Sequence, residues 1–198
     1  CAKPPLIPPD SVNANQICAS KIERGDLDGA LDACERSLRI APTYPDALFN
    51  RGAIYLHRGK YADAKRSLQA AIDFDSEHAR AHNDLGIVAY HEGRHDVAER
   101  LFRRALELKK NFYEARYNLA LTLKAAGEKE LSKSELRTLL KQKPEVFLSM
   151  SGINRYGLNR KEILDETATV SAAKAAAARA NGKLGGRPRK PKVAASPA

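Results

Sequence analysis

Apolar residues recur at helical spacing along much of this chain. In the stretch 96–109, Ala98, Leu101, Phe102, Ala105 and Leu106 stand three or four residues apart. An α-helix places residues at this spacing on one face, whereas a strand needs strict alternation of apolar and polar residues. The pattern therefore predicts an amphipathic helix that buries one face against a partner.

Four glycines show that the pattern has a fixed period. Gly25, Gly59, Gly93 and Gly127 are 34 residues apart, and small residues keep constant distances from them. These lie seven residues before (Cys18, Gly52, Gly86, Ala120), five after (Ala30, Ala64, Ala98, Ser132) and, in three units, twelve after (Ser37, Ala71, Ala105). Small side chains let two helices cross closely, and glycine makes the tight turn between them. Each unit is thus expected to be a helix, a turn and a second helix.

The period gives the expected helices directly. The first helices of the units (A helices) are predicted near 12–24, 46–58, 80–92 and 114–126. The second helices (B helices) are predicted near 28–40, 62–74, 96–109 and 130–142.

A 34-residue helix–turn–helix unit with these small residues resembles the tetratricopeptide repeat (TPR). The resemblance covers four units over residues 11–146, and unit four, with Leu139 at a usually small place, is the most divergent. It implies an all-α fold, a right-handed superhelical solenoid with the A helices along the concave side and no catalytic machinery. Arg51 departs from the family, which usually has an apolar residue there.

The segments outside the repeats have different compositions. Residues 1–10 are rich in proline and are expected to form an extended tether. Residues 147–182 are expected to add a capping or extra helical segment, with a capping-box pattern at 159–162. Residues 183–198 contain no acidic side chain, and two prolines stand within 183–192, so a disordered basic tail is expected there.

Composition and charge narrow the range of functions that the chain could have. No run of about 18 apolar residues exists, which excludes a polytopic membrane protein. The net charge is +10, but +6 of it falls in 145–198, so the repeats are nearly balanced. His78 and His82, like His91 and His95, are four residues apart, yet no further ligand completes a metal site. We expect no cofactor, no metal and no enzyme activity.

The resemblance places a peptide-binding groove on the A helices. Side-chain amides there can pair with the backbone of an extended partner segment, and aromatic side chains can anchor it. The alternative is that these residues only bridge neighbouring A helices. The candidates are Asn15, Phe49, Asn50, Asn83, Asp84, Ile87, Tyr90, Tyr117, Asn118 and Leu121. A clamp for acidic chain ends, known in one subtype, is incomplete, because Ala19 stands at an expected lysine place.

Three cysteines suggest two further features. Cys1, followed by the proline-rich stretch, resembles the lipid-modified first residue of a mature bacterial lipoprotein; a truncated sequence is the alternative. Cys18 and Cys34 fall on facing sides of the first A and B helices, where a disulfide is possible. Two reduced cysteines serving as small core residues are the other interpretation.

Two functions remain open from the sequence. The first is a non-enzymatic scaffold that binds a protein segment, anchored by lipid at Cys1 to the outer membrane in the periplasm, as in pilus or secretion assembly. The second is a cytoplasmic adaptor whose tail contacts nucleic acid. Arg187, Arg189, Lys190 and Lys192 partly resemble an AT-hook, and they also suit other anionic surfaces.

Overall fold

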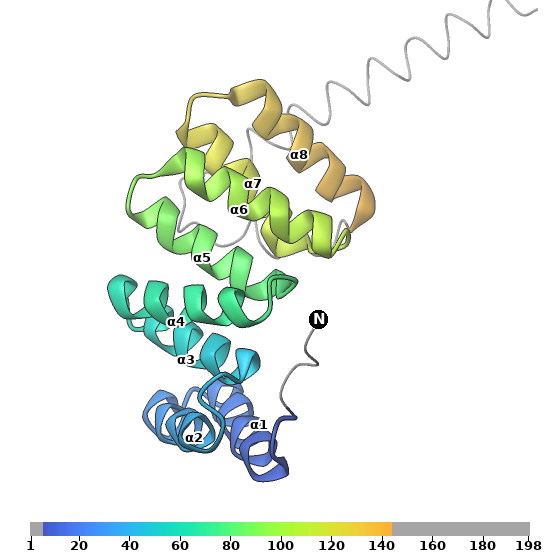
Figure 1. Ribbon diagram of the computed structural model, residues 1–198. Coiled ribbons are helices and arrows are strands. Elements are labelled where there is room, and N and C mark those ends of the chain that lie inside the picture. Colours follow the sequence, from blue (N-terminus) through green and yellow to red (C-terminus); the bar gives the residue numbers. More distant parts are fainter. Residues whose placement is uncertain (1–5, 144–198) are drawn as a thin grey trace, which may run out of the picture. The chain divides into compact units, whose positions relative to one another are not determined.

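A computed structural model describes residues 6–143 of the chain, which form eight α-helices and no strand (Figure 1). The A helices are α1 (Pro9–Glu23), α3 (Pro45–His57), α5 (Ala79–His91) and α7 (Tyr113–Ala125). The B helices are α2 (Leu27–Ile40), α4 (Tyr61–Phe74), α6 (His95–Leu108) and α8 (Lys129–Gln142). The all-α repeat fold is confirmed.

Helix α1 begins earlier than expected. It starts at Pro9 with Asp10 in its first turn, inside the range 1–10 that was assigned to a tether. A proline is compatible with the first helical position, because the amide hydrogen that it lacks would have no intrahelical acceptor there. The tether interpretation is therefore wrong for Pro9 and Asp10.

The periodic glycines make the turns, as their spacing predicted. All four have positive φ, between 68° and 87°. At the first turn, the amide of Gly25 donates to the carbonyl of Ile22 and that of Asp26 to Lys21, both at 3.0 Å. The other three turns close with the same pair of bonds. This left-handed C-terminal cap satisfies carbonyls that a helix end otherwise leaves free, and glycine adopts it without steric cost.

Close helix crossings explain the other small residues. Ala30, Ala64 and Ala98 are fully buried in the B helices. In the second repeat, a Cβ added to Gly52 would lie 2.7 Å from Leu68 Cγ. In the third, a Cβ on Gly86 would lie 2.7 Å from Phe102 Cε1. Any larger residue at these two places would therefore displace the side chain that packs on it.

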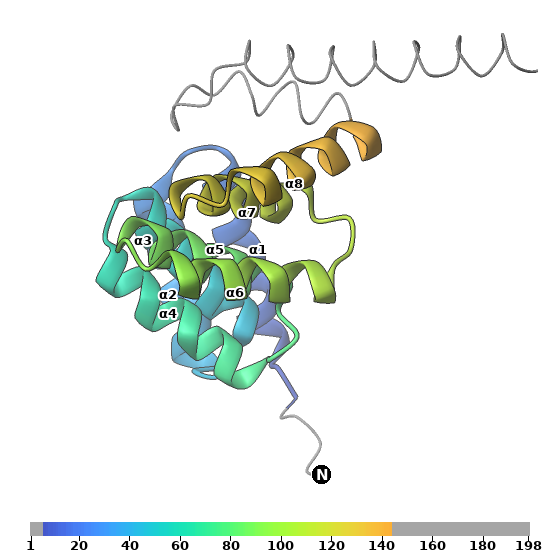
Figure 2. The same ribbon diagram turned by 90° about the horizontal axis from the view of Figure 1, so that it is seen from above.

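Successive repeats stack through both helix types. Each B helix contacts the next A helix, and the A helices contact one another in order, α1 with α3, α3 with α5 and α5 with α7. Seen from above, α2, α4 and α6 gather on one side of the stack (Figure 2). One apolar core joins residues of three repeats, including Leu38, Leu48, Leu68 and Leu85. We count places in the A helices from Ser11, Pro45, Ala79 and Tyr113, which are 34 residues apart. We call the surface formed by the second, fifth, sixth, ninth and twelfth places the A-helix face.

Candidate functional site

The A-helix face carries the predicted groove residues, but they differ in exposure. Asn15, Phe49, Asn50, Asn83, Tyr117 and Leu121 are buried. Asp84, Ile87, Tyr90 and Asn118 keep partial solvent contact. Phe49 and Tyr117, with 7% and 6% exposure, are not the exposed anchors that the sequence suggested. His78 and Arg80 of the following repeat cover Phe49, which a single-helix pattern does not reveal.

Pairs of asparagines join the A helices of neighbouring repeats. The Nδ2 of Asn50 donates to Asn15 Oδ1 at 2.8 Å, and that of Asn118 donates to Asn83 Oδ1 at 3.1 Å. A net stabilisation of about 1 kcal/mol is typical of each such bond. The bridging alternative therefore holds for these four residues. An amide has further donor and acceptor capacity, and the partly exposed Asn118 presents it to solvent.

The junction between repeats 2 and 3 lacks this asparagine pair. Phe49 stands at the fifth place of α3, and Asp84 at the sixth place of α5, where the other junctions have asparagines. The Phe49 ring lies 4.9 Å from the His78 ring, and the Arg80 guanidinium carbon lies 4.7 Å from the Phe49 centroid. A cation over an aromatic face is attracted to it and here also shields the ring from water.

Asp46 completes this arrangement at its edge. Its Oδ1 lies 3.2 Å from His78 Nε2 and 4.0 Å from Arg80. The hydrogen bond from His78 holds the pKa of Asp46 below its usual value, against the opposing effect of burial. From the sequence, His78 was considered only as a metal ligand, and Asp46 and Arg80 were not among the candidate site residues. The sequence did hold one signal for this contact: Asp46 and Arg80, of opposite charge, stand 34 residues apart at the second place of successive A helices.

Asp84 has an unusual environment for a carboxylate. Burial raises its pKa from 3.8 to about 6, although Asn83, Arg80, His57 and His78 all act to lower it. Its Oδ1 accepts a hydrogen bond at 2.9 Å from Nδ2 of Asn83 in the same helix. Within residues 6–143, no cationic nitrogen lies within 4.0 Å of this carboxylate. The charged form of Asp84 is thus only partly compensated.

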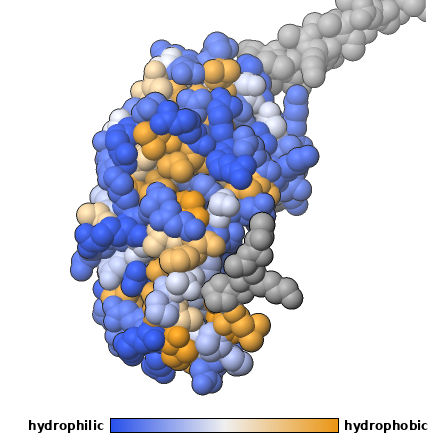
Figure 3. Space-filling model, viewed as in Figure 1, coloured by the Kyte–Doolittle hydropathy of each residue, from blue (hydrophilic) through white to orange (hydrophobic). Residues whose placement is uncertain are grey.

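Partly exposed apolar side chains stand at the ninth and twelfth places of the A helices in repeats 2 and 3. Ala53 and Leu56 pack on the core from α3, and Ile87 and Tyr90 do so from α5. Tyr90 also contacts the rings of His91 and His95, with centroid distances of 5.9 and 5.3 Å. On the side of the molecule drawn in Figure 3, apolar patches alternate with hydrophilic ones. The A-helix face likewise has both apolar and polar side chains, and such a surface suits a partner with both kinds of group.

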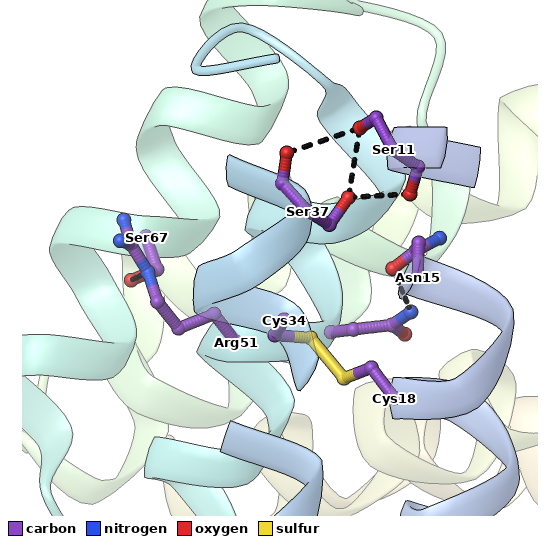
Figure 4. Close-up of a disulfide and its surroundings, with 8 residues drawn as sticks. Ser11, Asn15, Cys18, Cys34, Ser37, Arg51 and Ser67 are labelled. Atoms are coloured by element: carbon purple, nitrogen blue, oxygen red, sulfur yellow. Dashed lines mark hydrogen bonds between the residues drawn. A yellow bond between two sulfur atoms is a disulfide. The ribbon is translucent and has the colours of Figure 1, made fainter. Parts of the chain in front are cut away.

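A disulfide lies at the other end of the described chain. Cys18 of α1 is bonded to Cys34 of α2, with their Cα atoms 5.3 Å apart, and both residues are fully buried (Figure 4). Beside it, Ser11 and Ser37 exchange buried hydrogen bonds of 2.7 to 3.0 Å. The structure thus favours the disulfide over the two reduced cysteines. A cross-link of this kind typically stabilises a protein by about 2–4 kcal/mol.

The repeat pattern is matched by two family models, both described as tetratricopeptide repeat, over residues 49–111 and 89–146. The chain belongs to the tetratricopeptide repeat family. No curated protein matches this TPR chain in sequence.

Solved structures, among them two described as TPR proteins, share its fold. PilF of Pseudomonas aeruginosa is 20% identical, with a TM-score of 0.64, and the match covers 68% of this chain and 62% of PilF. YrrB, described as having an unusual peptide-binding site, is 20% identical, with a TM-score of 0.61 and 87% and 92% coverage. The first TPR domain of Spaghetti (RPAP3), bound to the HSP90 peptide SRMEEVD, is 21% identical, with a TM-score of 0.57 and 60% and 94% coverage.

The departure from the TPR pattern at Arg51 has a structural explanation. Arg51 Nε donates to Ser67 Oγ of α4 at 3.1 Å (Figure 4). The guanidinium thus has a polar partner within its own repeat, while its aliphatic part fills the place of the usual apolar side chain.

The remaining predicted sites lie outside the described residues. These are Cys1, the segment 147–182 and the tail residues Arg187, Arg189, Lys190 and Lys192. Among residues 6–143, no helix is long and apolar enough to span a membrane. The same part of the chain contains no group of three or more potential metal ligands.

Proposed function

We propose that this TPR protein is a non-enzymatic scaffold that binds an extended segment of a partner protein along the A-helix face of repeats 2 to 4. The observation that carries the proposal is the strip of partly exposed Leu56, Ile87 and Tyr90 beside the half-buried amide of Asn118. Apolar and aromatic groups supply contact area, and an amide can satisfy the polar backbone of a segment that lies across it.

The packing of the face supports a preformed site. Ile87 and Tyr90 are held from below by a core that includes Ala89, Phe102 and Leu119. Side chains fixed in this way lose little conformational freedom on binding, so more of the contact energy contributes to affinity.

A peptide selection on the full chain tests the proposal. Peptides enriched from a random library should bind the double variant Ile87→Ala, Tyr90→Ala (the groove variant) with an affinity about ten-fold or more below that of the original chain. The matched control is Phe74→Ala, since Phe74 is 55% exposed at the end of a B helix. Equal affinity of the groove variant and the original chain would exclude this face as the binding site.

For localisation we propose the periplasm, with a lipid anchor at Cys1 at the outer membrane and a role in assembling pilus or secretion machinery. The Cys18–Cys34 disulfide supports an oxidising compartment, because cytosolic thiols are generally kept reduced. The fold likeness to PilF is consistent with a pilus role. Intact mass of native protein tests the anchor: acyl chains on Cys1 are expected, and an unmodified Cys1 contradicts it.

The second candidate is a nucleic-acid adaptor that uses the tail at Arg187, Arg189, Lys190 and Lys192. The concentration of positive charge in 183–198 favours it. Deleting 183–198 should then abolish salt-sensitive binding to AT-rich DNA, while Ile87→Ala, Tyr90→Ala should leave it unchanged. If the scaffold proposal is correct, the deletion leaves peptide binding intact.

A further inference from the structure

Of the three junctions between repeats, one presents a carboxylate where the other two present asparagine amides. Asn50 and Asn118 occupy the sixth place of their A helices and donate to the preceding repeat. Asp84 occupies the same place in α5, but Phe49 stands opposite and offers no polar atom. The carboxylate is left with a hydrogen bond from its own helix neighbour, Asn83.

The cationic groups near Asp84 are engaged elsewhere. Arg80 covers the Phe49 ring and points toward Asp46, and His78 hydrogen-bonds the same Asp46. His57 acts on Asp84 only through its longer-range charge. The A-helix face of repeats 2 and 3 therefore contains a partly buried, partly solvent-accessible carboxylate that no cation of residues 6–143 contacts.

The surroundings of Asp84 strengthen any new ion pair formed there. Water screens charges less in a partly buried site, so a cation placed against the carboxylate gains more than it would on an open surface. Ile87, one helical turn from Asp84 in α5, would help to exclude further water once a segment covered it. An acidic segment would instead bring like charges together at low screening, which is unfavourable.

We propose that the partner segment carries a lysine or arginine whose cationic group pairs with Asp84, between apolar residues that contact Leu56, Ile87 and Tyr90. This inference rests on the proposed function and specifies its ligand chemistry. The occupant is an extended segment of another protein, selected by charge complementarity to Asp84 rather than by a free carboxylate end.

Selection from a random peptide library at pH 7.5 tests the inference with the full chain. The original chain should enrich lysine or arginine at one fixed position flanked by apolar residues. Asp84→Asn keeps an oxygen that can accept the bond from Asn83, so it should still enrich the apolar residues but lose the basic preference. The matched control is Asp96→Asn, since Asp96 is exposed on a B helix and paired with Arg100.

Affinity measurements on the leading peptide give a second readout. Its affinity should fall at least ten-fold in Asp84→Asn and less than two-fold in Asp96→Asn. Replacing the peptide's basic residue by norleucine should weaken binding to the original chain but not to Asp84→Asn. Between pH 7.5 and pH 5, affinity for the original chain should fall as Asp84 gains a proton, and Asp84→Asn should lack this fall.

The outcomes separate the two proposals. Recovery of no peptide at all would overturn the proposed function, and this inference with it. Peptides that depend on Ile87 and Tyr90, but show no basic preference or bind Asp84→Asn equally well, would overturn only the inference.

Discussion

In the first repeat a disulfide joins Cys18 of the A helix to Cys34 of the B helix, whereas at the same two places of the third repeat Gly86 faces Phe102. The second repeat has Gly52 against Leu68 at these places. A large side chain packed on a glycine gains its stability from buried apolar area and close contact. The cysteines bury little area, and the covalent bond restricts the unfolded chain instead. One crossing geometry is thus stabilised by two unrelated means.

The largest effect should come from removing the packed side chain. Phe102→Ala should lower the free energy of unfolding by about 3–5 kcal/mol, because it removes a buried ring and leaves a cavity above Gly86. Urea unfolding measures it. Phe74→Ala is the control, since Phe74 is 55% exposed and should change stability little. A small effect of Phe102→Ala would show that the neighbouring repeats, and not this crossing, stabilise repeat 3.

Reduction of the disulfide should have the next largest effect and a local one. The bond spans 16 residues of sequence, for which a loss of about 3 kcal/mol is expected. Hydrogen exchange should show faster exchange in α1 and α2, with α5 and α6 nearly unchanged. The double variant Cys18→Ala, Cys34→Ala should behave like the reduced chain. Unchanged protection of α1 would mean that Ser11, Ser37 and the Asn15–Asn50 bond already hold repeat 1.

Enlarging Gly86, which faces Phe102 at this crossing, should also destabilise the third repeat. Gly86→Ala should destabilise by about 1–3 kcal/mol, because its Cβ would meet Phe102 at 2.7 Å. The gain in helix propensity, at most about 1 kcal/mol, offsets only part of this. Combining it with Phe102→Leu should recover part of the loss relative to the sum of the two single changes. Additive free energies in that double-mutant cycle would contradict direct contact.

The smallest change in stability is expected at the junctions between repeats. There, two junctions have a pair of asparagine amides and the third has the carboxylate of Asp84. With a folded-state pKa raised to about 6, Asp84 binds a proton more readily when folded than when unfolded. Stability contributed by the protonated form is therefore lost as pH rises from about 4 through 6. Asp84→Asn should remove this loss and stabilise the chain at pH 7 by about 1–2 kcal/mol. This is less than the full shift in pKa corresponds to, because the side chain keeps solvent contact and water screens its charge.

Urea unfolding of Asp84→Asn at pH 4.5 and pH 7 measures this difference. Asp96→Asn, at an exposed carboxylate, is the control. If Asp84→Asn destabilises the chain at pH 7, Arg80, His57 and His78 compensate the charge more fully than its raised pKa indicates.

The fold was predictable because the sequence of each repeat contains the signals for its own helices and turn. Glycines at a fixed period give the left-handed turns, and small residues at fixed offsets give the crossings. The start of α1 was missed because proline is unfavourable inside a helix but is compatible with its first position. The facing places of Cys18 and Cys34 also followed from the period, so the structural pairing of these residues had a sequence signal.

The groove was less predictable from residue identity. The candidate residues lie on the A helices, yet Phe49 and Tyr117 are buried, and four asparagines bond to one another. Exposure depends on what the rest of the fold places over a side chain, as His78 and Arg80 do over Phe49, and hydrogen-bond partners lie 35 residues away in sequence. A helical pattern contains neither kind of information.

The sequence alone determined the elements, their period and the face that each helix buries, because these follow from propensities and contacts within one 34-residue unit. Tertiary structure decided which polar groups on the A-helix face are already satisfied. Asn50 donates a hydrogen bond to the amide of Asn15 in the preceding repeat. At the place that corresponds to Asn15, the repeat before Asp84 has Phe49, whose ring is covered by Arg80, so the charge of Asp84 stays incompletely compensated. That difference arises only when two repeats are packed together, since burial and charge compensation depend on the surroundings in space.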